Sequence, residues 1–247
     1  MQALILAAGL GKRLKPLTDK MPKSLIEVNG KPILINILDH LSDRDIHEVL
    51  LVVGDKKDLI INSVGHFYKN MKITYIENPI FDKTNNVYSF WLAKNYIHED
   101  LLMLECDLFF KRNLIDIVLQ GLADCNILVS RFDKETMDGT VVEIDNENNV
   151  KSLIIKKFQD DRFNYNDKMK TVNIYLFRKK FIIDQFLPMI ELYVRTQSVN
   201  SYYELVLGSL IYFKNADIKA IEIDQSQWCE IDNLMDLKRA ETSFKII

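Results

Sequence analysis

Apolar runs alternate with amphipathic stretches along the first half of the chain. The runs are short and bounded by glycine or charged residues, as buried strands are, and they cover 2–7, 49–53, 72–76 and 101–105. Between them, helices are predicted over 33–41, about 55–66, 86–97 and about 112–122, where apolar residues recur at helical spacing. Asp55 is the expected cap of the second of these helices, which ends at about His66. Strands separated by helices predict a parallel sheet with right-handed crossovers. Ligands of such sheets bind beyond the carboxyl ends of the strands, where Gly9, Gly54 and Asp107 are expected.

The second half mixes strand and helix patterns in a different order. Strands are predicted over 126–130, 140–145, 150–156, 172–177 and 218–223. Helices are predicted over 179–194, 202–213 and 233–244. No linker rich in proline, glycine or serine divides the chain, and no repeat is visible. We therefore expect one α/β domain over residues 1–247, with a Rossmann-like, mostly parallel sheet flanked by helices and a small antiparallel excursion.

Composition and charge exclude several classes of protein. The 247 residues carry 32 lysines and arginines against 35 aspartates and glutamates, a net charge of −3, which argues against a protein that coats nucleic acid. The 3 cysteines form no CxxC pair and the 4 histidines form no HExxH motif, so a zinc site is not expected. The apolar run 3–8 is too short for a membrane span or a secretory leader. We expect a cytoplasmic protein without a nucleic-acid or membrane partner.

The sharpest local signal is the run ILAAGLGKRLKPLT at 5–18, followed by MPKSLIEVNGKPIL at 21–34. A strand ends at Ala7, small residues follow up to Gly11, and the cations Lys12 and Arg13 come next. Small residues let backbone N–H groups approach an oxyanion, and arginine binds phosphate oxygens in pairs. The run matches neither a P-loop, which has Ser or Thr after its lysine, nor the dinucleotide-binding glycine pattern. A glycine-rich turn with solvated basic residues is the alternative interpretation.

This region closely resembles the signature LAAGxGxRLxPLTxxxPKxLxxVxGKPxL of the nucleotidyltransferases that activate sugar phosphates and phosphocholine. The matching residues are Leu6, Ala7, Ala8, Gly9, Gly11, Arg13, Leu14, Pro16, Leu17, Thr18, Pro22, Lys23, Leu25, Val28, Gly30, Lys31, Pro32 and Leu34. The resemblance implies a loop that holds the nucleotide, formed by Leu6, Ala7, Ala8, Gly9, Gly11 and Lys12. It also implies that Arg13 and Lys23 act on the phosphates as catalytic residues.

Three later segments resemble the branch of this family that uses CTP. NPIFDKTNNVYSFWLAK at 78–94 implies nucleotide-binding roles for Asn86, which is also the expected helix cap, and for Ser89. LLMLECDLFF at 101–110 implies that Asp107 binds Mg²⁺, and an aspartate directly after a buried strand is costly without a partner. QWCEIDNLMDLKRAE at 227–241 implies a second metal-binding carboxylate, Asp232. For both aspartates, capping of a helix is the structural alternative.

The segments 137–145, 170–177 and 202–204 look most like cytidylyltransferases that act on phosphonates and phosphoalkanolamines. The resemblance places Lys157 and Asn173 toward the phosphate group of the acceptor. Glu204 and the nearby aromatic residues Tyr175, Tyr202 and Tyr203 are expected around an ammonium group, through charge and cation–π contact. Tyrosines at strand or helix spacing are more often core residues, so Tyr175 has a structural interpretation as well.

Together these residues predict a Mg²⁺-dependent cytidylyltransferase. It transfers CMP from CTP to a small phosphorylated or phosphonate acceptor, of the phosphocholine, phosphoethanolamine or 2-aminoethylphosphonate type, and releases pyrophosphate. The nucleotide-binding part is expected over about 1–125 and the acceptor-binding part over about 126–247. The alternatives are a phosphoglutamine cytidylyltransferase, a sugar-1-phosphate nucleotidyltransferase and a regulatory subunit that binds nucleotide without catalysis.

Overall fold

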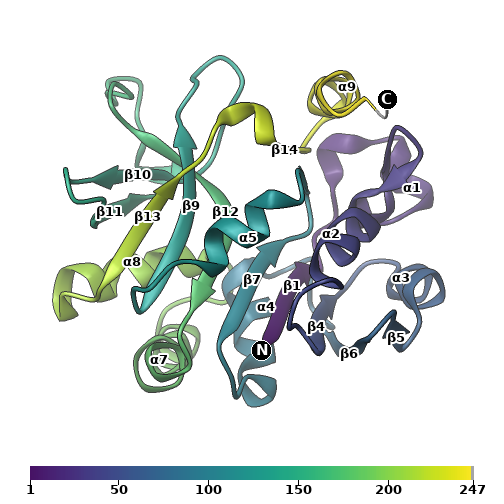
Figure 1. Ribbon diagram of the computed structural model, residues 1–247, viewed down its shortest axis with the longest axis horizontal. Helices are drawn as coiled ribbons and strands as arrows, with labels where there is room; N and C mark the ends of the chain where they lie inside the picture. The colour runs from purple at the N-terminus through teal and green to yellow at the C-terminus, as the bar shows by residue number, and fades with distance from the viewer. Residues whose placement is uncertain (246–247) are drawn as a thin grey trace.

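A central sheet lies between two layers of helices (Figure 1). This computed structural model describes residues 1–245. The strands are ordered β13 (Ile218–Glu222), β9 (Cys125–Arg131), β12 (Met169–Phe177), β7 (Leu101–Glu105), β1 (Gln2–Ala7), β4 (Glu48–Val53), β6 (Met71–Glu77) and β5 (Phe67–Tyr68). Strands β7, β1, β4 and β6 are parallel, and β12 runs antiparallel to its neighbours β7 and β9. The carboxyl ends of β1, β6 and β7 therefore meet at the same edge of the sheet.

Helices cover both faces of this sheet and enclose two hydrophobic cores. One core includes residues of α2 (Ile33–Leu41), α3 (Lys57–Val64), α5 (Asn113–Leu119) and α9 (Leu234–Ser243). The other includes residues of α4 (Asn86–Ala93), α7 (Leu187–Thr196) and α8 (Tyr203–Lys214). In β1, Ala3 and Ile5 point into the first core, while Leu4 and Leu6 point into the second. A strand that is buried on both faces has to be apolar throughout, which explains the run that opens the chain.

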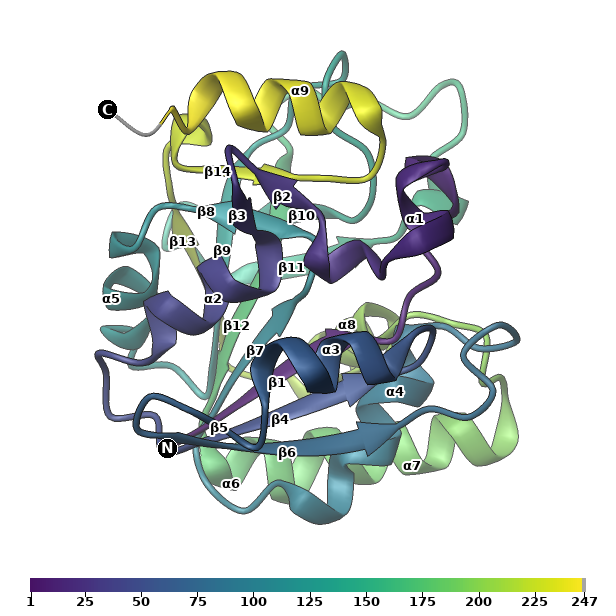
Figure 2. The ribbon, with the colours of Figure 1, turned by 90° about the vertical axis from the view of Figure 1, so that its right-hand side faces the viewer.

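Small antiparallel elements complete the structure. A hairpin is formed by β2 (Glu27–Val28) and β3 (Lys31–Pro32), and β8 (Leu108–Phe110) pairs with β14 (Trp228–Glu230). Figure 2 shows α9 at one end of the view, next to β14, and α7 at the opposite end. None of the helices within residues 1–245 is long and apolar enough to cross a membrane.

Strand β12 changes partner along its length. Its first residues pair with β10 (Val141–Ile144), which in turn pairs with β11 (Val150–Ile154), whereas its last residues pair with β7. The register against β9 shifts between Thr171 and Tyr175, and Asn173 has a φ of 59°, in the left-handed region. Such a bulge re-aims side chains, and here it separates β10 from β7.

The sequence predicted this fold class correctly, and most predicted strands and helices are present with shifted ends. Two predicted caps are wrong. Asn85, not Asn86, precedes α4 and accepts a hydrogen bond from the Asn86 backbone N–H, because Asn86 is already the first residue of the helix. Asp55 does not cap α3. The N-cap residue of this helix is Lys56, which adopts the left-handed conformation. The predicted helix 179–194 is divided into α6 (Lys179–Phe181), a π-helical turn and α7.

Candidate active site

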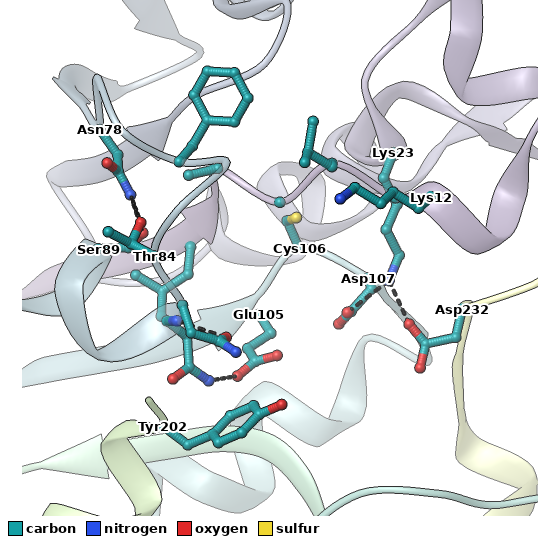
Figure 3. Close-up of a pocket in the computed structure, with 18 of the residues that line it drawn as sticks. Lys12, Lys23, Asn78, Thr84, Ser89, Glu105, Cys106, Asp107, Tyr202 and Asp232 are labelled. Atoms are coloured by element: carbon teal, nitrogen blue, oxygen red, sulfur yellow. Dashed lines mark hydrogen bonds and ion pairs between the residues drawn. The ribbon is translucent and has the colours of Figure 1, made fainter. Parts of the chain in front are cut away.

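A cavity of about 490 Å³ opens at the carboxyl ends of β1, β6 and β7 (Figure 3). The loops after these strands form its walls, together with α4 and the segment that follows β14. Its lining comprises Leu6, Ala8, Gly9, Leu10, Gly11, Lys12, Arg13, Lys23, Asn78, Phe81, Thr84, Asn85, Asn86, Ser89, Glu105, Cys106, Asp107, Tyr202 and Asp232. The cavity thus combines small residues, cations and carboxylates that are far apart in the sequence.

The loop after β1 depends on a glycine in the left-handed conformation. Gly11 has a φ of 58°, and an added Cβ would lie 2.9 Å from Thr18 Cγ2 and 3.0 Å from Lys23 Cβ. The Thr18 hydroxyl donates a hydrogen bond of 3.0 Å to the Gly11 carbonyl oxygen. Because glycine has no Cβ, Gly11 allows the loop to pack directly against the side chain of Lys23.

Lys23 is a buried lysine held between two aspartates. Its Nζ lies 2.8 Å from Asp107 Oδ2 and 2.7 Å from Asp232 Oδ1, and the residue is only 8% exposed. Burial by itself lowers the pKa of Lys23, but the charges and hydrogen bonds of both aspartates outweigh it and raise the pKa above its ordinary value. Lys23 is therefore a permanent cation, and it is the partner that the partly buried Asp107 requires.

Arg13 approaches the same centre from the solvent side. Its Nη2 lies 2.7 Å from Asp232 Oδ2, while 61% of its side chain remains exposed. Burial raises the pKa of Asp232, but the Lys23 charge and hydrogen bond and the Arg13 charge outweigh it, so the pKa lies below its ordinary value. The centre consequently consists of two carboxylates and two cations, of which Arg13 is the more exposed.

The opposite wall is built by the loop before α4. Asn78 is buried, and its side-chain amide donates to the Thr84 hydroxyl at 2.9 Å and to the Ser89 hydroxyl at 3.2 Å. Its side-chain oxygen accepts a hydrogen bond from the backbone N–H of Ile80. These bonds, two of which join the labelled Asn78, Thr84 and Ser89 in Figure 3, fix the loop that carries the lining residue Phe81.

A second cavity of about 340 Å³ lies beside the first, in the gap between β10 and β7. The residues that line both cavities are Arg13, Asn86, Glu105, Asp107, Tyr202 and Asp232. The second cavity also includes Asp138, Gly139, Thr140, Ile155, Lys156, Lys170, Asn173, Glu204 and Glu230. Asp107 and Asp232, which pair with Lys23, thus lie between the two cavities.

Asn86 connects the carboxylates of the second cavity. Its side-chain amide donates to Glu105 Oε1 at 3.1 Å and to Glu204 Oε2 at 3.5 Å. Its oxygen accepts from the Tyr203 backbone N–H at 3.0 Å, and the Tyr203 hydroxyl donates to Glu105 at 3.0 Å. Burial raises the pKa of both glutamates above their ordinary values. Asn86 therefore holds this part of the site together.

The β12 bulge supplies the other side of the second cavity. Lys170 is 1% exposed, and its Nζ lies 3.2 Å from Glu230 Oε2. The Asn173 amide donates to Glu230 Oε1 at 3.3 Å, and its oxygen accepts from the Thr171 hydroxyl at 2.7 Å. Burial raises the pKa of Glu230 to about 7, although the Lys170 charge opposes it.

The two aspartates of this centre are too few to bind a divalent cation without further oxygen ligands from a substrate. Asp107 and Asp232 provide carboxylate oxygens at one point, and Asp107 Oδ1 is buried without a hydrogen-bond partner. Residues 1–245 contain no group of three or more His, Cys, Asp or Glu arranged to hold a metal ion. Mg²⁺ is commonly bound by one or two carboxylates together with substrate phosphates, so these two aspartates suit that ion.

The family model for nucleotidyl transferases matches residues 2–203, most of the chain. The protein belongs to the nucleotidyl transferase family. The CMP-5'-(3-aminopropyl)phosphonate synthase of Streptomyces rubellomurinus is 31% identical over 244 residues, 99% of this chain and 39% of that protein. The CTP:phosphoglutamine cytidylyltransferase of Campylobacter jejuni is 27% identical over 271 residues, 96% of this chain and 98% of that protein.

A solved nucleotidyl transferase shares the fold. The CTP:phosphocholine cytidylyltransferase of Streptococcus pneumoniae superimposes with a TM-score of 0.77 at 21% identity, and the match covers 98% of this chain and 97% of that one. Against several curated relatives, however, the chain spans only 39–55% of their length.

Most residues expected from the nucleotidyl transferase signature line the first cavity. They are Leu6, Ala8, Gly9, Gly11, Lys12, Arg13, Lys23, Asn86, Ser89, Asp107 and Asp232. Ala7 is the last residue of β1 and packs into the core instead. Asn173 and Glu204, which the resemblance assigns to the acceptor, line the second cavity.

Two expected acceptor residues lie elsewhere. Lys157 is exposed and does not line either cavity, whereas the preceding Lys156 lines the second one. Tyr175 is fully buried and stacks on Phe177 in the core. Side chains alternate between the two faces of a regular strand, so Asn173 and Tyr175 would share a face in such a strand. The bulge in β12 breaks this alternation.

Sequence reasoning missed several lining residues. Asn78, Phe81 and Thr84 lie in a segment that we singled out only for its Asn-Asn-Val-Tyr-Ser stretch. Lys170 stands two residues before the bulge, and only its position in a strand-like run with polar residues marks it. The predicted strand begins at residue 172, whereas β12 begins at Met169 and includes Lys170.

Proposed function

We propose that the protein is a cytidylyltransferase, which transfers CMP from CTP to a small phosphorylated or phosphonate acceptor and releases pyrophosphate. The observation that carries this proposal is the position of Lys23. Its ammonium group is held by Asp107 and Asp232, and these aspartates line both cavities. A fixed cation at this boundary lies where two anionic substrates have to meet.

Each part of the first cavity has a role in this proposal. The backbone of the loop from Ala8 to Gly11 and the Lys12 side chain bind the triphosphate. Arg13 stabilises the leaving pyrophosphate, and Lys23 neutralises charge between the α-phosphate and the acceptor. Asp107 and Asp232 would hold Mg²⁺, which would supply charge to polarise the α-phosphate. Positioning and charge neutralisation then account for most of the catalysis.

The transfer is direct in this proposal, because an acceptor oxygen that is already anionic needs no general base. Cys106 lines the first cavity, but its burial and the Asp107 charge raise the pKa of its thiol well above the ordinary value. A thiol that stays protonated is a poor nucleophile. A covalent intermediate on Cys106 is therefore not expected.

Relatives support the choice of CTP and of the acceptor class. The Streptomyces synthase is named for a CMP-phosphonate product, and the Campylobacter enzyme is named for CTP and phosphoglutamine. Both align with nearly the whole of this chain, 99% and 96% of it. The match to the second also spans 98% of that protein.

Pyrophosphate release in the presence of Mg²⁺ tests the proposal. CTP, UTP, dTTP, ATP and GTP are each combined with phosphocholine, phosphoethanolamine, 2-aminoethylphosphonate, phosphoglutamine and glucose-1-phosphate. Release confined to CTP with a non-sugar acceptor supports the proposal. Release with glucose-1-phosphate and another nucleotide moves the protein to the sugar-phosphate transferases. No release with any pair contradicts the proposal.

A further inference from the structure

The segment that carries Asp232 leaves the sheet after β14 and leads into α9. Ile231 is fully buried, and its backbone N–H donates a hydrogen bond of 2.9 Å to the Asp107 carbonyl oxygen. Both oxygens of the Asp232 carboxylate are engaged, Oδ1 by Lys23 at 2.7 Å and Oδ2 by Arg13 at 2.7 Å. A rotation of the backbone at Asp232 would therefore break both ion pairs at once.

Asp236, in the first turn of α9, is bonded to the backbone of this segment. Its Oδ2 accepts hydrogen bonds from the backbone N–H groups of Asp232 at 3.0 Å and of Asn233 at 3.1 Å. Its Oδ1 accepts a hydrogen bond from the Arg239 guanidinium, and its side chain is only 13% exposed. Bonds of this kind, with an ionised partner, are among the stronger hydrogen bonds in proteins. The Asp236 carboxylate is thus held from both sides.

The bond from Asp236 to Asp232 exceeds what a helix cap requires. In a capping box, the residue at the third helical position accepts from the N-cap backbone N–H, which here belongs to Asn233. The Asn233 side chain in turn accepts from the backbone N–H groups of Met235 and Asp236. That pattern is complete without the Asp232 N–H, which lies one residue before the cap. The additional bond joins α9 to the aspartate that pairs with Lys23.

We propose that Asp236 is a positioning residue, which fixes the orientation of the Asp232 carboxylate for the transfer of CMP. The inference rests on the proposed transferase function and adds a residue that lines neither cavity, so Asp236 acts through Asp232. Groups that orient a metal-binding side chain commonly contribute ~10–100-fold to metal affinity or activity. Stabilisation of α9 alone is the competing explanation, and the tests below separate the two.

The first test compares Asp236→Ala with Asn233→Ala, which removes the other half of the same capping box. The Asn233 side chain accepts from N–H groups inside α9, so its loss weakens the helix without releasing Asp232. Both variants are expected to lower the urea midpoint by similar amounts. For transfer from CTP, kcat/KM is expected to fall ~10–100-fold in Asp236→Ala and to stay close to the wild-type value in Asn233→Ala. Equal activities in the two variants overturn the inference.

The second test is rescue by Asp236→Asn. Asparagine retains one side-chain oxygen, which can accept from the two backbone N–H groups. Asp236→Asn is therefore expected to recover most of the activity that Asp236→Ala loses, and an equal loss in these two variants overturns the inference. If Asp236→Ala does not fold, Asp236→Ser replaces it, because the serine hydroxyl ends one bond short of the carboxylate oxygen.

Nucleotide binding provides a readout that does not depend on turnover. Isothermal titration calorimetry measures the dissociation constant of CTP with Mg²⁺ in the absence of an acceptor. Asp232 would bind the ion together with the phosphates, so this constant is expected to rise at least ~10-fold in Asp236→Ala and to stay unchanged in Asn233→Ala. Equal dissociation constants in the two variants overturn the inference.

These outcomes separate the inference from the function on which it rests. A wild-type protein that transfers CMP from CTP, with two alanine variants that behave alike, keeps the cytidylyltransferase proposal and overturns the positioning role of Asp236. Absence of transfer by the wild-type protein with every acceptor contradicts both.

Discussion

Gly11→Ala tests whether the glycine loop positions Lys23. Alanine in the left-handed conformation costs about 1–2 kcal/mol. The new Cβ would also lie 2.9 Å from Thr18 Cγ2 and 3.0 Å from Lys23 Cβ, where neighbouring atoms have to move. Overpacking of this kind costs a further ~1–3 kcal/mol. We therefore expect the free energy of unfolding to fall by about 2–5 kcal/mol in total.

Gly30→Ala is the matched control for this variant. Gly30 has a φ of 81° in the β2–β3 turn, and an added Cβ would meet nothing within 4 Å. It carries the conformational cost without the overlap, so a loss of about 1–2 kcal/mol is expected. Urea unfolding measures both variants, and pyrophosphate release measures kcat/KM.

Activity should separate the two glycine variants more clearly than stability does. A displacement of Lys23 by about 1 Å is enough to lower kcat/KM roughly 100-fold in Gly11→Ala, whereas Gly30→Ala keeps its activity. Equal stability losses and equal activities in the two variants would refute the reasoning, because the backbone conformation alone would then explain both.

Three further predictions concern the Lys23–Asp107–Asp232 centre, the cap of α4 and the partly buried His40. Asp107→Asn removes one partner of Lys23, so turnover should fall at least ~10²-fold at the same Mg²⁺ while the circular dichroism spectrum is retained; wild-type rates would contradict the metal assignment. Asn85→Ala should lower the free energy of unfolding by about 1 kcal/mol, and an unchanged urea midpoint would argue against this cap. Burial lowers the pKa of His40 from 6.5 to about 4, so the unfolded chain binds the proton at a higher pH than the folded one. The free energy of unfolding should therefore fall as the pH is lowered from 6.5 to 4. His40→Gln should flatten this dependence, and equal pH profiles of the free energy of unfolding in the two proteins would exclude the effect.

Local patterns were enough to predict the sheet and the first cavity. The strand at 2–7 is apolar on both faces, and the signature that follows it is continuous in sequence, so the loop and Lys23 could be placed together. The resemblance linked the three distant segments that carry Lys23, Asp107 and Asp232, but the ion pairs between these residues were not predicted. Their contact joins residues that are 84 and 209 positions apart.

The acceptor side was harder to predict because it depends on a break in a strand. The regular alternation of β12 would place Asn173 and Tyr175 on one face, yet the bulge sends Asn173 to the cavity and Tyr175 to the core. Likewise, the choice between Lys156 and Lys157 depends on a short helical turn after β11. Antiparallel pairing of β8 with β14 was not predicted, since each strand has only three residues.

Phosphorus NMR of a single reaction tests the central claim most directly. CTP, Mg²⁺ and 2-aminoethylphosphonate are incubated with the wild-type protein and with Lys23→Met. The account predicts that the wild-type protein consumes CTP and forms pyrophosphate and a CMP–phosphonate in equal amounts, and that Lys23→Met is slower by about 10²–10³-fold. Conversion of CTP to CDP and inorganic phosphate, or a Lys23→Met variant as fast as wild type, would contradict it.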